Sequence, residues 1–331
     1  MRIWLNQSHS LTSLVRTVRA ERQSIDLCIS TVNPIAPSRT VAAESWNEPA
    51  WDSPGYAEWA LDTAVEKQID VFAPQRGRRG IAAIADRFAA AGIRLESAAD
   101  AQTLDLIDDK VAFSQDLADH PLMPMMIRAT DAAEFERAVA HVVAERGSAC
   151  VKPSRGIFGQ GYWTLATGDA FTSYEDPDAR IADPVAYAEA MRSAGESGRT
   201  FDLAVMEHLP GVEASVDVIA ERGQTRLAAT RIKVTGTRQS ITNDHELIGF
   251  AADLVQYYRL NGAVNVQFKK NAEGDWRILE INARIAGGAS YNDVVGIPYS
   301  VSWMDMLANR SQVDVPLINA SVDGILTGWP S

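Results

Sequence analysis

The chain has 331 residues, with 43 acidic and 31 basic side chains and a formal net charge of −12. With 46% hydrophobic and 22% charged residues it has an ordinary globular composition, which excludes a disordered chain and a fibrous repeat. The Lys and Arg residues are scattered, whereas nucleic-acid binding needs a basic stripe to neutralise phosphates, so we expect no nucleic-acid partner. The N-terminus lacks an apolar signal core and no window reaches about 18 apolar residues, so we expect a cytoplasmic protein without a membrane partner.

Residues 1–103 alternate short apolar runs with helical patterns. The runs "IWL", "IDLCIST" and "IDVFAPQ" have the length of buried strands. Helical spacing follows the first run at Leu11, Leu14, Val15 and Val18, and the segments 55–68 and 80–92 are also helical in pattern, the second ending at Gly92. Strands that alternate with helices indicate parallel strands and crossover helices, so this part is predicted to be a small doubly wound α/β domain.

Residues 104–310 have a different pattern, typical of an α+β domain. The segment 103–120 is predicted to be one helix, with Thr103 as its cap and His120-Pro121 at its end. After residue 200, strand patterns dominate, and turns such as Arg222-Gly223 and Glu273-Gly274 indicate antiparallel hairpins. Residues 168–200 interrupt this pattern, either as a mobile flap or as a plain surface insertion. Residues 311–331 form a C-terminal tail.

The two cysteines, Cys28 and Cys150, lie far apart in the sequence, each beside apolar residues. A disulfide framework normally uses several closely spaced cysteines in a short secreted chain. We therefore expect two buried, reduced thiols.

The segment "VKPSRGIFGQGYW", residues 151–163, carries three glycines after a lysine. Glycine at this density indicates backbone that passes close to a ligand or adopts positive φ angles. The segment matches neither the Gly-x-x-x-x-Gly-Lys phosphate loop nor the Gly-x-Gly-x-x-Gly dinucleotide motif, because its lysine precedes the glycines. Taken alone, the loop favours a glycine-rich hairpin of purely structural role.

Acidic and amide side chains recur at two hairpins further along the chain. Glu207 and Glu213 flank a Pro210-Gly211 turn, where they could hold ring nitrogens, sugar hydroxyls or a metal, or remain a solvated surface pair. In "VNVQFKKNAEGDWRILEINARIAGG", alternation places Glu280 and Asn282 on one face of a strand, and Gln267 can share that polar face. Such oxygen donors suit Mg²⁺ when phosphate and water complete its coordination.

The order of these segments resembles the ATP-grasp superfamily, which includes biotin carboxylase and the large chain of carbamoyl phosphate synthetase. The resemblance covers about residues 60–300 and is carried mainly by "KPSRGIFGQG" together with "EINARIAGG". It implies a pre-ATP-grasp α/β domain over residues 1–103, followed by a two-lobed ATP-grasp domain over residues 104–310. A more distant likeness, carried by "RGIFGQGYW", is to ATP-grasp proteins encoded with tellurite-resistance and stress genes.

The resemblance implies a nucleotide site between two α+β lobes. Lys110 matches the lysine on the phosphate side, and Lys152 matches the lysine that reaches phosphate and adenine. The glycine loop, with Gly156, Gly159 and Gly161, would fold over the phosphates and direct backbone N–H groups at their oxygens.

The adenine and the ribose have their own implied contacts. Glu207, with the backbone of His208 and Leu209, matches the linker that reads adenine. Glu213 matches the acid that binds the ribose hydroxyls.

The implied metal ligands are Gln267, Glu280 and Asn282, with Gln267 at a position where relatives often have an acid. They would hold Mg²⁺, or Mn²⁺ in its place. Arg284 matches the arginine that steadies the phosphate or a substrate carboxylate. Arg155 adds a cation for the γ-phosphate. In "TRIKVTGT", Lys233 and Arg231 are either phosphate or substrate cations or exposed basic residues of a strand.

The resemblance implies an ADP-forming carboxylate–amine ligase that acts through an acylphosphate, with a small carboxylate and an amine as substrates. Relatives are usually homodimers, so a homodimer is expected. Two other classes are open: a non-catalytic or regulatory ATP-binding module, and a dehydrogenase-type α/β enzyme. "WLNQSHSLTS" has no glycine fingerprint, which argues against the dehydrogenase.

Overall fold

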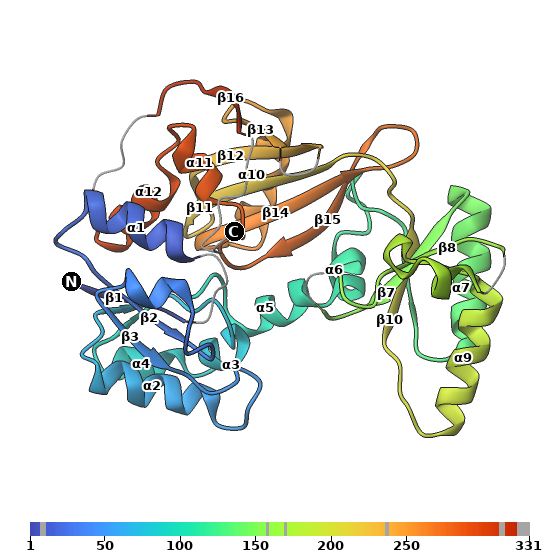
Figure 1. Cartoon of the computed structure of the whole chain (residues 1–331), viewed down its shortest axis with the longest axis horizontal. Helices are drawn as coiled ribbons and strands as arrows, with labels where there is room; N and C mark the ends of the chain where they lie inside the picture. Colours follow the sequence, from blue (N-terminus) through green and yellow to red (C-terminus); the bar gives the residue numbers. More distant parts are fainter. Residues whose placement is uncertain (7–10, 157–158, 169–170, 236–237, 311–314, 323–331) are drawn as a thin grey trace. The chain divides into compact units, whose positions relative to one another are not determined.

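The computed structural model describes residues 1–6, 11–156, 159–168, 171–235, 238–310 and 315–322 (Figure 1). Ile157 and Phe158 of the glycine loop and most of the tail over residues 311–331 lie outside these ranges. The chain divides into two compact units. Unit 1 comprises Met1–Asp105, Ala214–Gln267 and Ile281–Ser331, and unit 2 comprises Leu106–Glu213 and Phe268–Glu280. The domain boundaries at residues 103 and 310 stay a prediction.

Unit 1 begins with a parallel five-stranded sheet in the order β3-β2-β1-β4-β5. Side chains alternate along its central strand, so Ile3 and Leu5 pack with α1 in one cluster, while Trp4 packs with α2 and α4 in another. The sheet is therefore covered on both faces, and the predicted doubly wound α/β fold is confirmed. Its elements are β1 (Arg2–Asn6), α1 (Leu11–Glu21), β2 (Asp26–Thr31), η1 (Pro37–Thr40), β3 (Glu44–Asn47), α2 (Tyr56–Glu66), β4 (Val71–Phe72), α3 (Arg78–Ala82), α4 (Ala85–Ala90) and β5 (Arg94–Leu95).

A second sheet follows the order β15-β14-β11-β12-β13-β16. The pairs β11–β12, β12–β13 and β13–β16 are antiparallel, and the β11–β12 turn falls at Arg222-Gly223 as predicted. The outer part of the β14–β15 hairpin, residues 268–280, belongs to unit 2. The elements are β11 (Glu213–Glu221), β12 (Gln224–Thr235), β13 (Arg238–Thr242), α10 (Glu246–Tyr257), β14 (Gly262–Lys270), β15 (Trp276–Asn282), α11 (Ser290–Val294), α12 (Tyr299–Leu307) and β16 (Asn319–Val322).

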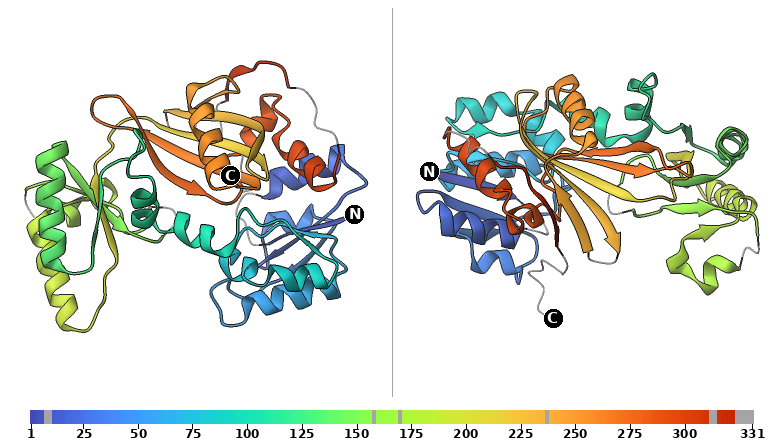
Figure 2. Two further views of the ribbon diagram at one scale, coloured as in Figure 1. Left: turned by 180° about the vertical axis from the view of Figure 1, so that it is seen from behind. Right: turned by 90° about the horizontal axis from the view of Figure 1, so that it is seen from above.

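Unit 2 is built on a five-stranded sheet in the order β6-β10-β7-β8-β9. Helices α7 and α9 lie side by side against it (Figures 1 and 2), and the rings of Phe135 and Tyr187 stack between them at 5.0 Å. Ala188 and Met191 of α9 are part of the core, so this helix of the predicted insertion packs one face against the sheet. The elements are β6 (Met126–Ala129), α7 (Ala132–Arg146), β7 (Ala149–Pro153), β8 (Trp163–Leu165), α8 (Thr172–Glu175), η2 (Pro177–Ala179), β9 (Ile181–Ala182), α9 (Pro184–Glu196) and β10 (Leu203–Glu207).

The helix predicted over residues 103–120 is interrupted, and that prediction was wrong at its centre. The structure has α5 (Ala101–Asp108) and α6 (Lys110–Asp116), separated at Asp109, whose φ of −98° and ψ of 105° are extended. The Asp109 side chain accepts hydrogen bonds from Val111 N and Ala112 N, which makes it the N-cap of a new helix. Lys110 is consequently the first residue of α6.

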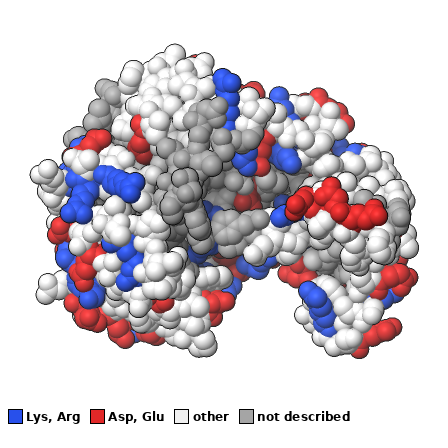
Figure 3. Space-filling view, in the orientation of Figure 1, with Lys and Arg blue, Asp and Glu red and all other residues white. Residues whose placement is uncertain are grey.

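Composition-based expectations about the surface and the thiols can be compared with the structure. Both cysteines are free and buried, as expected. On the face seen in Figure 3, acidic and basic side chains of the described residues are interspersed rather than gathered into a basic stripe. Among the residues that the structure describes, no helix has the length and apolar character needed to cross a membrane.

Candidate functional site

The two predicted lysines lie at the start of α6 and near the end of β7, in unit 2. Lys110 is buried, its backbone N–H donates to Ser154 O at 3.0 Å, and its Nζ donates to Gly156 O at 3.1 Å. Lys152 is also buried, on a strand paired with β10 on one side and β8 on the other. The fold therefore joins the helix that carries the first lysine to the strand that carries the second.

The ammonium group of Lys152 is in an environment that disfavours its charge. Burial lowers its pKa most, Glu280 raises it, and the neighbouring cations Lys110 and Lys269 lower it further, to about 8. Lysine ammonium groups are rarely buried beside other cations, because the interior does not replace their hydration. An anion in this place would offset the cost, which makes the lysine pair a candidate phosphate site.

The described part of the glycine loop is held by cations from two other segments. Lys110 Nζ binds Gly156 O, and Arg180 Nη1 donates to Gly159 O at 2.7 Å. Gly161 has a φ of 69°, and a Cβ there would lie 2.9 Å from Pro153 Cδ, so only glycine fits without strain. The loop glycines thus have a backbone role, as the sequence predicts.

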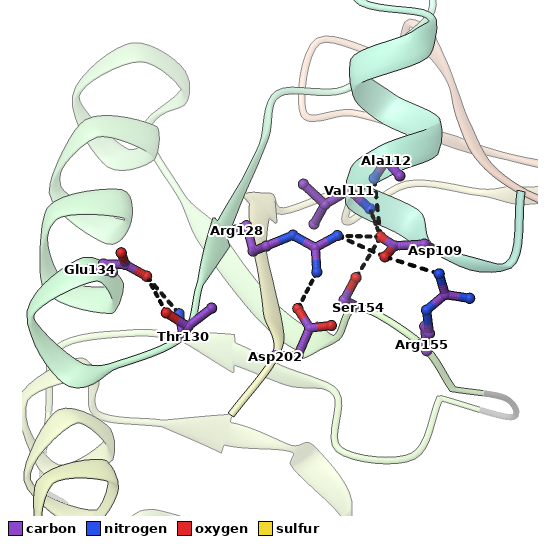
Figure 4. A network of polar contacts seen from close by, with 9 residues as sticks. All are labelled: Asp109, Val111, Ala112, Arg128, Thr130, Glu134, Ser154, Arg155 and Asp202. Carbon is purple, nitrogen blue, oxygen red and sulfur yellow. Dashed lines mark hydrogen bonds and ion pairs between the residues drawn. The ribbon is translucent and has the colours of Figure 1, made fainter. Parts of the chain in front are cut away.

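Asp109 is the centre of a polar network that sequence reasoning missed (Figure 4). Its carboxylate accepts from Arg128 Nη2 at 2.6 and 2.7 Å and from Ser154 Oγ at 2.7 Å, and Arg155 Nη2 lies 3.4 Å away. Arg128 also pairs with Asp202, the residue before β10. The available signal was the "DDK" sequence, in which an aspartate directly before the lysine can cap a helix.

The predicted adenine linker follows β10 in the same unit. Glu207 is buried, its backbone N–H donates to Met125 O at 3.0 Å, and His208 N donates to Ser148 O at 3.3 Å. His208 is half-buried, and burial lowers the pKa of its imidazole, with a smaller contribution from the Lys269 cation. Glu213 is partly exposed at the first residue of β11.

A small apolar cluster adjoins this linker. Cys150, Met206 and Leu209 are buried together, with Met126, Tyr162 and Leu279 partly exposed at its border. Burial raises the pKa of the Cys150 thiol to about 11, so this cysteine acts as an apolar group rather than as a nucleophile. The cluster offers a small apolar surface beside a polar backbone segment.

The predicted metal ligands lie on β14 and β15. Gln267, Glu280 and Asn282 are all partly exposed, and Glu280 and Asn282 occupy alternate positions of β15. No group of three His, Cys, Asp or Glu side chains suited to a metal occurs among the described residues. The donor set of one carboxylate and two amide oxygens therefore fits a hard cation only if phosphate and water supply the other ligands.

The remaining predicted residues, Arg284 and Lys233, belong to unit 1. Arg284 follows β15, its N–H donates to Asn282 O at 2.8 Å, and its Nη1 donates to Ile285 O at 3.0 Å. Lys233 is exposed on β12. Its neighbour Arg231 is buried in an ion pair with Asp217, so the "TRIK" segment contains one structural cation as well as one exposed cation.

Comparisons with known proteins bear on the fold. Residues 199–323 match the family model described as "ATP-grasp in the biosynthetic pathway with Ter operon". The matched region lies outside the glycine loop that carried the sequence likeness to tellurite-resistance proteins. No curated protein sequence matches the chain.

Solved structures match nearly the whole chain. The ADP complex of PurK, an N5-carboxyaminoimidazole ribonucleotide synthetase, is 15% identical with a TM-score of 0.68, over 97% of this chain and 80% of that chain. The Staphylococcus aureus N5-carboxyaminoimidazole synthetase with ADP is 12% identical with a TM-score of 0.66, over 94% and 78%. The biotin carboxylase domain of Hydrogenobacter thermophilus 2-oxoglutarate carboxylase with MgADP is 14% identical with a TM-score of 0.64, over 95% and 70%. The chain has the ATP-grasp fold.

Proposed function

We propose that the chain is an ATP-dependent, ADP-forming carboxylate–amine ligase that acts through an acylphosphate on a small carboxylic acid or amino acid. The observation that carries this proposal is the pair of buried lysines, Lys110 and Lys152, beside the glycine loop. The similar structures include complexes with ADP and with MgADP, which supports the same nucleotide for this chain.

Each part of a nucleotide has a proposed partner. Lys110, Lys152 and the backbone of Gly156, Gly159 and Gly161 bind the phosphates. The linker of Glu207, His208 and Leu209 binds adenine, whose apolar faces the adjoining cluster can accommodate. Glu213 binds the ribose hydroxyls, since a partly exposed carboxylate accepts from two neighbouring hydroxyls.

Gln267, Glu280 and Asn282 are proposed to hold Mg²⁺, or Mn²⁺, together with phosphate oxygens. When bound, the ion neutralises charge on the phosphates. Arg284, Lys233 and Arg155 are proposed to steady the γ-phosphate or the substrate carboxylate, because fixed cations stabilise the charge that develops on the equatorial oxygens during phosphoryl transfer.

The proposed reaction has two balanced steps. A substrate carboxylate oxygen attacks the γ-phosphorus, the bond from that phosphorus to the bridging oxygen breaks, and ADP leaves. The amine then attacks the acyl carbon of the acylphosphate, inorganic phosphate leaves, and a proton is lost from nitrogen to give the amide. The substrates are small molecules, and a homodimer in the cytoplasm is proposed as the working state.

Two measurements test the proposal in order. Calorimetry should detect binding of a non-hydrolysable ATP analogue that depends on Mg²⁺, and pooled amino acids and carboxylic acids should elicit ADP release from ATP. Absence of nucleotide binding overturns the whole proposal. A different outcome is that the ATP analogue binds but no pool elicits ADP release. If the Glu280→Ala variant then also keeps its biological activity, the alternative of a regulatory ATP-binding module is favoured.

The affinity for the ATP analogue is expected to fall as the pH rises above 8. Lys152 has a pKa of about 8 in the free chain, so its ammonium is present below that pH and is lost above it. If only the charged form binds phosphate, affinity falls by up to about tenfold per pH unit beyond 8. Dissociation constants between pH 7 and pH 9.5 measure this.

The matched variant is Lys152→Arg, whose guanidinium stays charged over this pH range and should remove the decline. A decline of equal steepness in that variant would assign the loss of affinity to the titration of another group.

The free energy of unfolding should change with pH in the opposite direction to the affinity. The folded pKa lies below the ordinary value of 10.5, so this lysine makes the free energy of unfolding rise between about pH 8 and pH 10.5.

A further inference from the structure

We propose that Asp109 is a positioning residue, which fixes Lys110 against the end of β7 so that the Lys110 ammonium faces the start of the glycine loop. The inference rests on the proposed function, because it concerns how the phosphate-binding lysine is held. It assigns to Asp109 a role beyond that of a helix cap.

Capping alone explains only part of the contacts of this side chain. An N-cap needs one oxygen that accepts from the first turn, and Asp109 Oδ1 meets this need at 3.1 Å from Val111 N and 3.0 Å from Ala112 N. Asparagine would cap equally well. The further contacts, to Arg128, Ser154 and Arg155, come from β6, from the residue after β7 and from the glycine loop (Figure 4).

The contacts at Asp109 Oδ2, to Arg128 and Arg155, require a carboxylate, whereas an asparagine Oδ1 could still accept from Ser154. Burial opposes its charge, but hydrogen bonds from Arg128, Ser154 and Ala112 outweigh this effect and hold the pKa of Asp109 well below its usual value. The side chain is therefore ionised at neutral pH. Arg128 binds it through one nitrogen shared between both oxygens, at 2.6 and 2.7 Å, and this charge-assisted pairing fixes the carboxylate strongly.

The backbone completes the connection between the two lysine-bearing segments. Lys110 N donates to Ser154 O at 3.0 Å, while Ser154 Oγ donates to Asp109 at 2.7 Å, so two hydrogen bonds run in opposite directions between α6 and the end of β7. Ser154 N in turn donates to Asp202 O at 2.9 Å. Lys110 is thus held at its own N–H and at the residue before it, which leaves only its side-chain torsions to adjust.

This restraint acts against electrostatic repulsion. The Lys110 and Lys152 cations lie close enough for the first to lower the pKa of the second. Without a restraint, two like charges in a buried place would separate, either by rotation of the side chain or by displacement of the helix. A carboxylate outside the lysine pair holds the backbone in place and leaves both ammonium groups available for phosphate.

The test is Asp109→Asn in the full chain, with a non-hydrolysable ATP analogue and Mg²⁺ as the probe. Asparagine keeps the cap but loses the ionic contacts with Arg128, so the dissociation constant should rise about tenfold. The matched control is Asp131→Asn, which alters the aspartate cap of α7, where the side chain accepts from Glu134 N at 2.7 Å. The control should change the dissociation constant less than about twofold.

A second measurement separates positioning from general damage to the fold. If Asp109 acts through Lys110, then adding Asp109→Asn to Lys110→Met should weaken binding less than about threefold further. Full additivity of the two substitutions contradicts the proposal. If Asp109→Asn does not fold, Ser154→Ala replaces it, because it removes one contact of Asp109 and leaves the cap intact.

The outcomes also separate this inference from the proposed function. A wild-type chain that does not bind the analogue overturns the proposed function. A wild-type chain that binds, with Asp109→Asn binding equally well, overturns only the positioning role of Asp109.

Discussion

Replacing Asp217 by alanine is expected to lower the free energy of unfolding by about 3–5 kcal/mol, because it leaves a buried guanidinium without its counter-ion. Asp217 on β11 is fully buried, and Arg231 on β12 binds both of its oxygens, at 2.5 and 3.1 Å. Asn265 and Asn292 donate to the same carboxylate at 2.9 and 2.8 Å. One substitution therefore removes the acceptor for four hydrogen bonds.

The loop after β15 lies close to the Arg231 guanidinium, which also donates from Nη1 to Gln239 Oε1 at 2.9 Å. A Cβ on Gly288 would lie 2.4 Å from Arg231 Nη1, so the loop after β15 packs directly on the guanidinium. The side-chain oxygens of Asn265 and Asn292 are buried, and they have no hydrogen-bond partner among the residues that the structure describes. Loss of the Asp217 carboxylate would leave donors on Arg231, Asn265 and Asn292 without their present acceptor.

Urea unfolding measures this prediction, with two variants for comparison. Glu221→Ala removes a surface ion pair with Arg226 on the same hairpin, in which both side chains are about 40% exposed, and should cost less than about 1 kcal/mol. The double substitution Asp217→Leu with Arg231→Met removes both charges and should cost less than Asp217→Ala alone. Equal losses for Asp217→Ala and Glu221→Ala would show that the buried pair contributes no more than a surface pair.

The general architecture follows from patterns that are local in sequence. Alternating apolar runs and helical spacing predict the doubly wound sheet of unit 1. Arg222-Gly223 predicts the turn between β11 and β12 in the second sheet, because both residues adopt positive φ angles there. Local patterns do not reveal which face of an element another segment covers. For this reason α9 was predicted to lie in a flap or surface insertion, although the packing of Met191 makes it part of the core.

The interruption at Asp109 has the same physical origin. Aspartate is tolerated inside a helix and favoured at a cap, and the choice depends here on partners that are distant in sequence. Arg128 lies 19 residues from Asp109 and Ser154 lies 45 residues away. A helical pattern over residues 103–120 contains no information about either contact, so it predicts one continuous helix.

The residues proposed for the nucleotide site stay a prediction, and the sequence alone did not reveal the contacts that support them. The order of Lys110, Lys152 and the glycine loop along the chain is sufficient to state the resemblance to the ATP-grasp superfamily. Arg231 illustrates what such an order does not provide. Alternation along the strand assigns Arg231 to one face of β12. Only the structure shows that Asp217 packs against it, so that this candidate ligand-binding cation is part of a buried ion pair.

Replacing Lys152 by methionine is expected to weaken binding of the ATP analogue by about 10–100-fold and to stabilise the fold. Hydrogen bonds to charged groups contribute about 1.5–3 kcal/mol, which sets the range for the loss of affinity. The gain in stability follows from the lowered pKa of Lys152, because the folded chain at pH 7 holds an ammonium that burial disfavours. Methionine fills the same space without charge and should raise the free energy of unfolding by about 1–3 kcal/mol.

The opposite signs of these two effects distinguish a binding residue from a structural one. A lysine retained only for packing would lose stability on substitution, whereas a ligand-binding group often costs stability in the free protein. Lys270→Met is the control, because this lysine lies on the same hairpin as Lys269, over the ring of Trp276 at 4.9 Å, and should change affinity less than about twofold. Urea unfolding and calorimetry on the same samples give both quantities. Unchanged affinity with reduced stability for Lys152→Met would assign this lysine to the core and remove it from the nucleotide site.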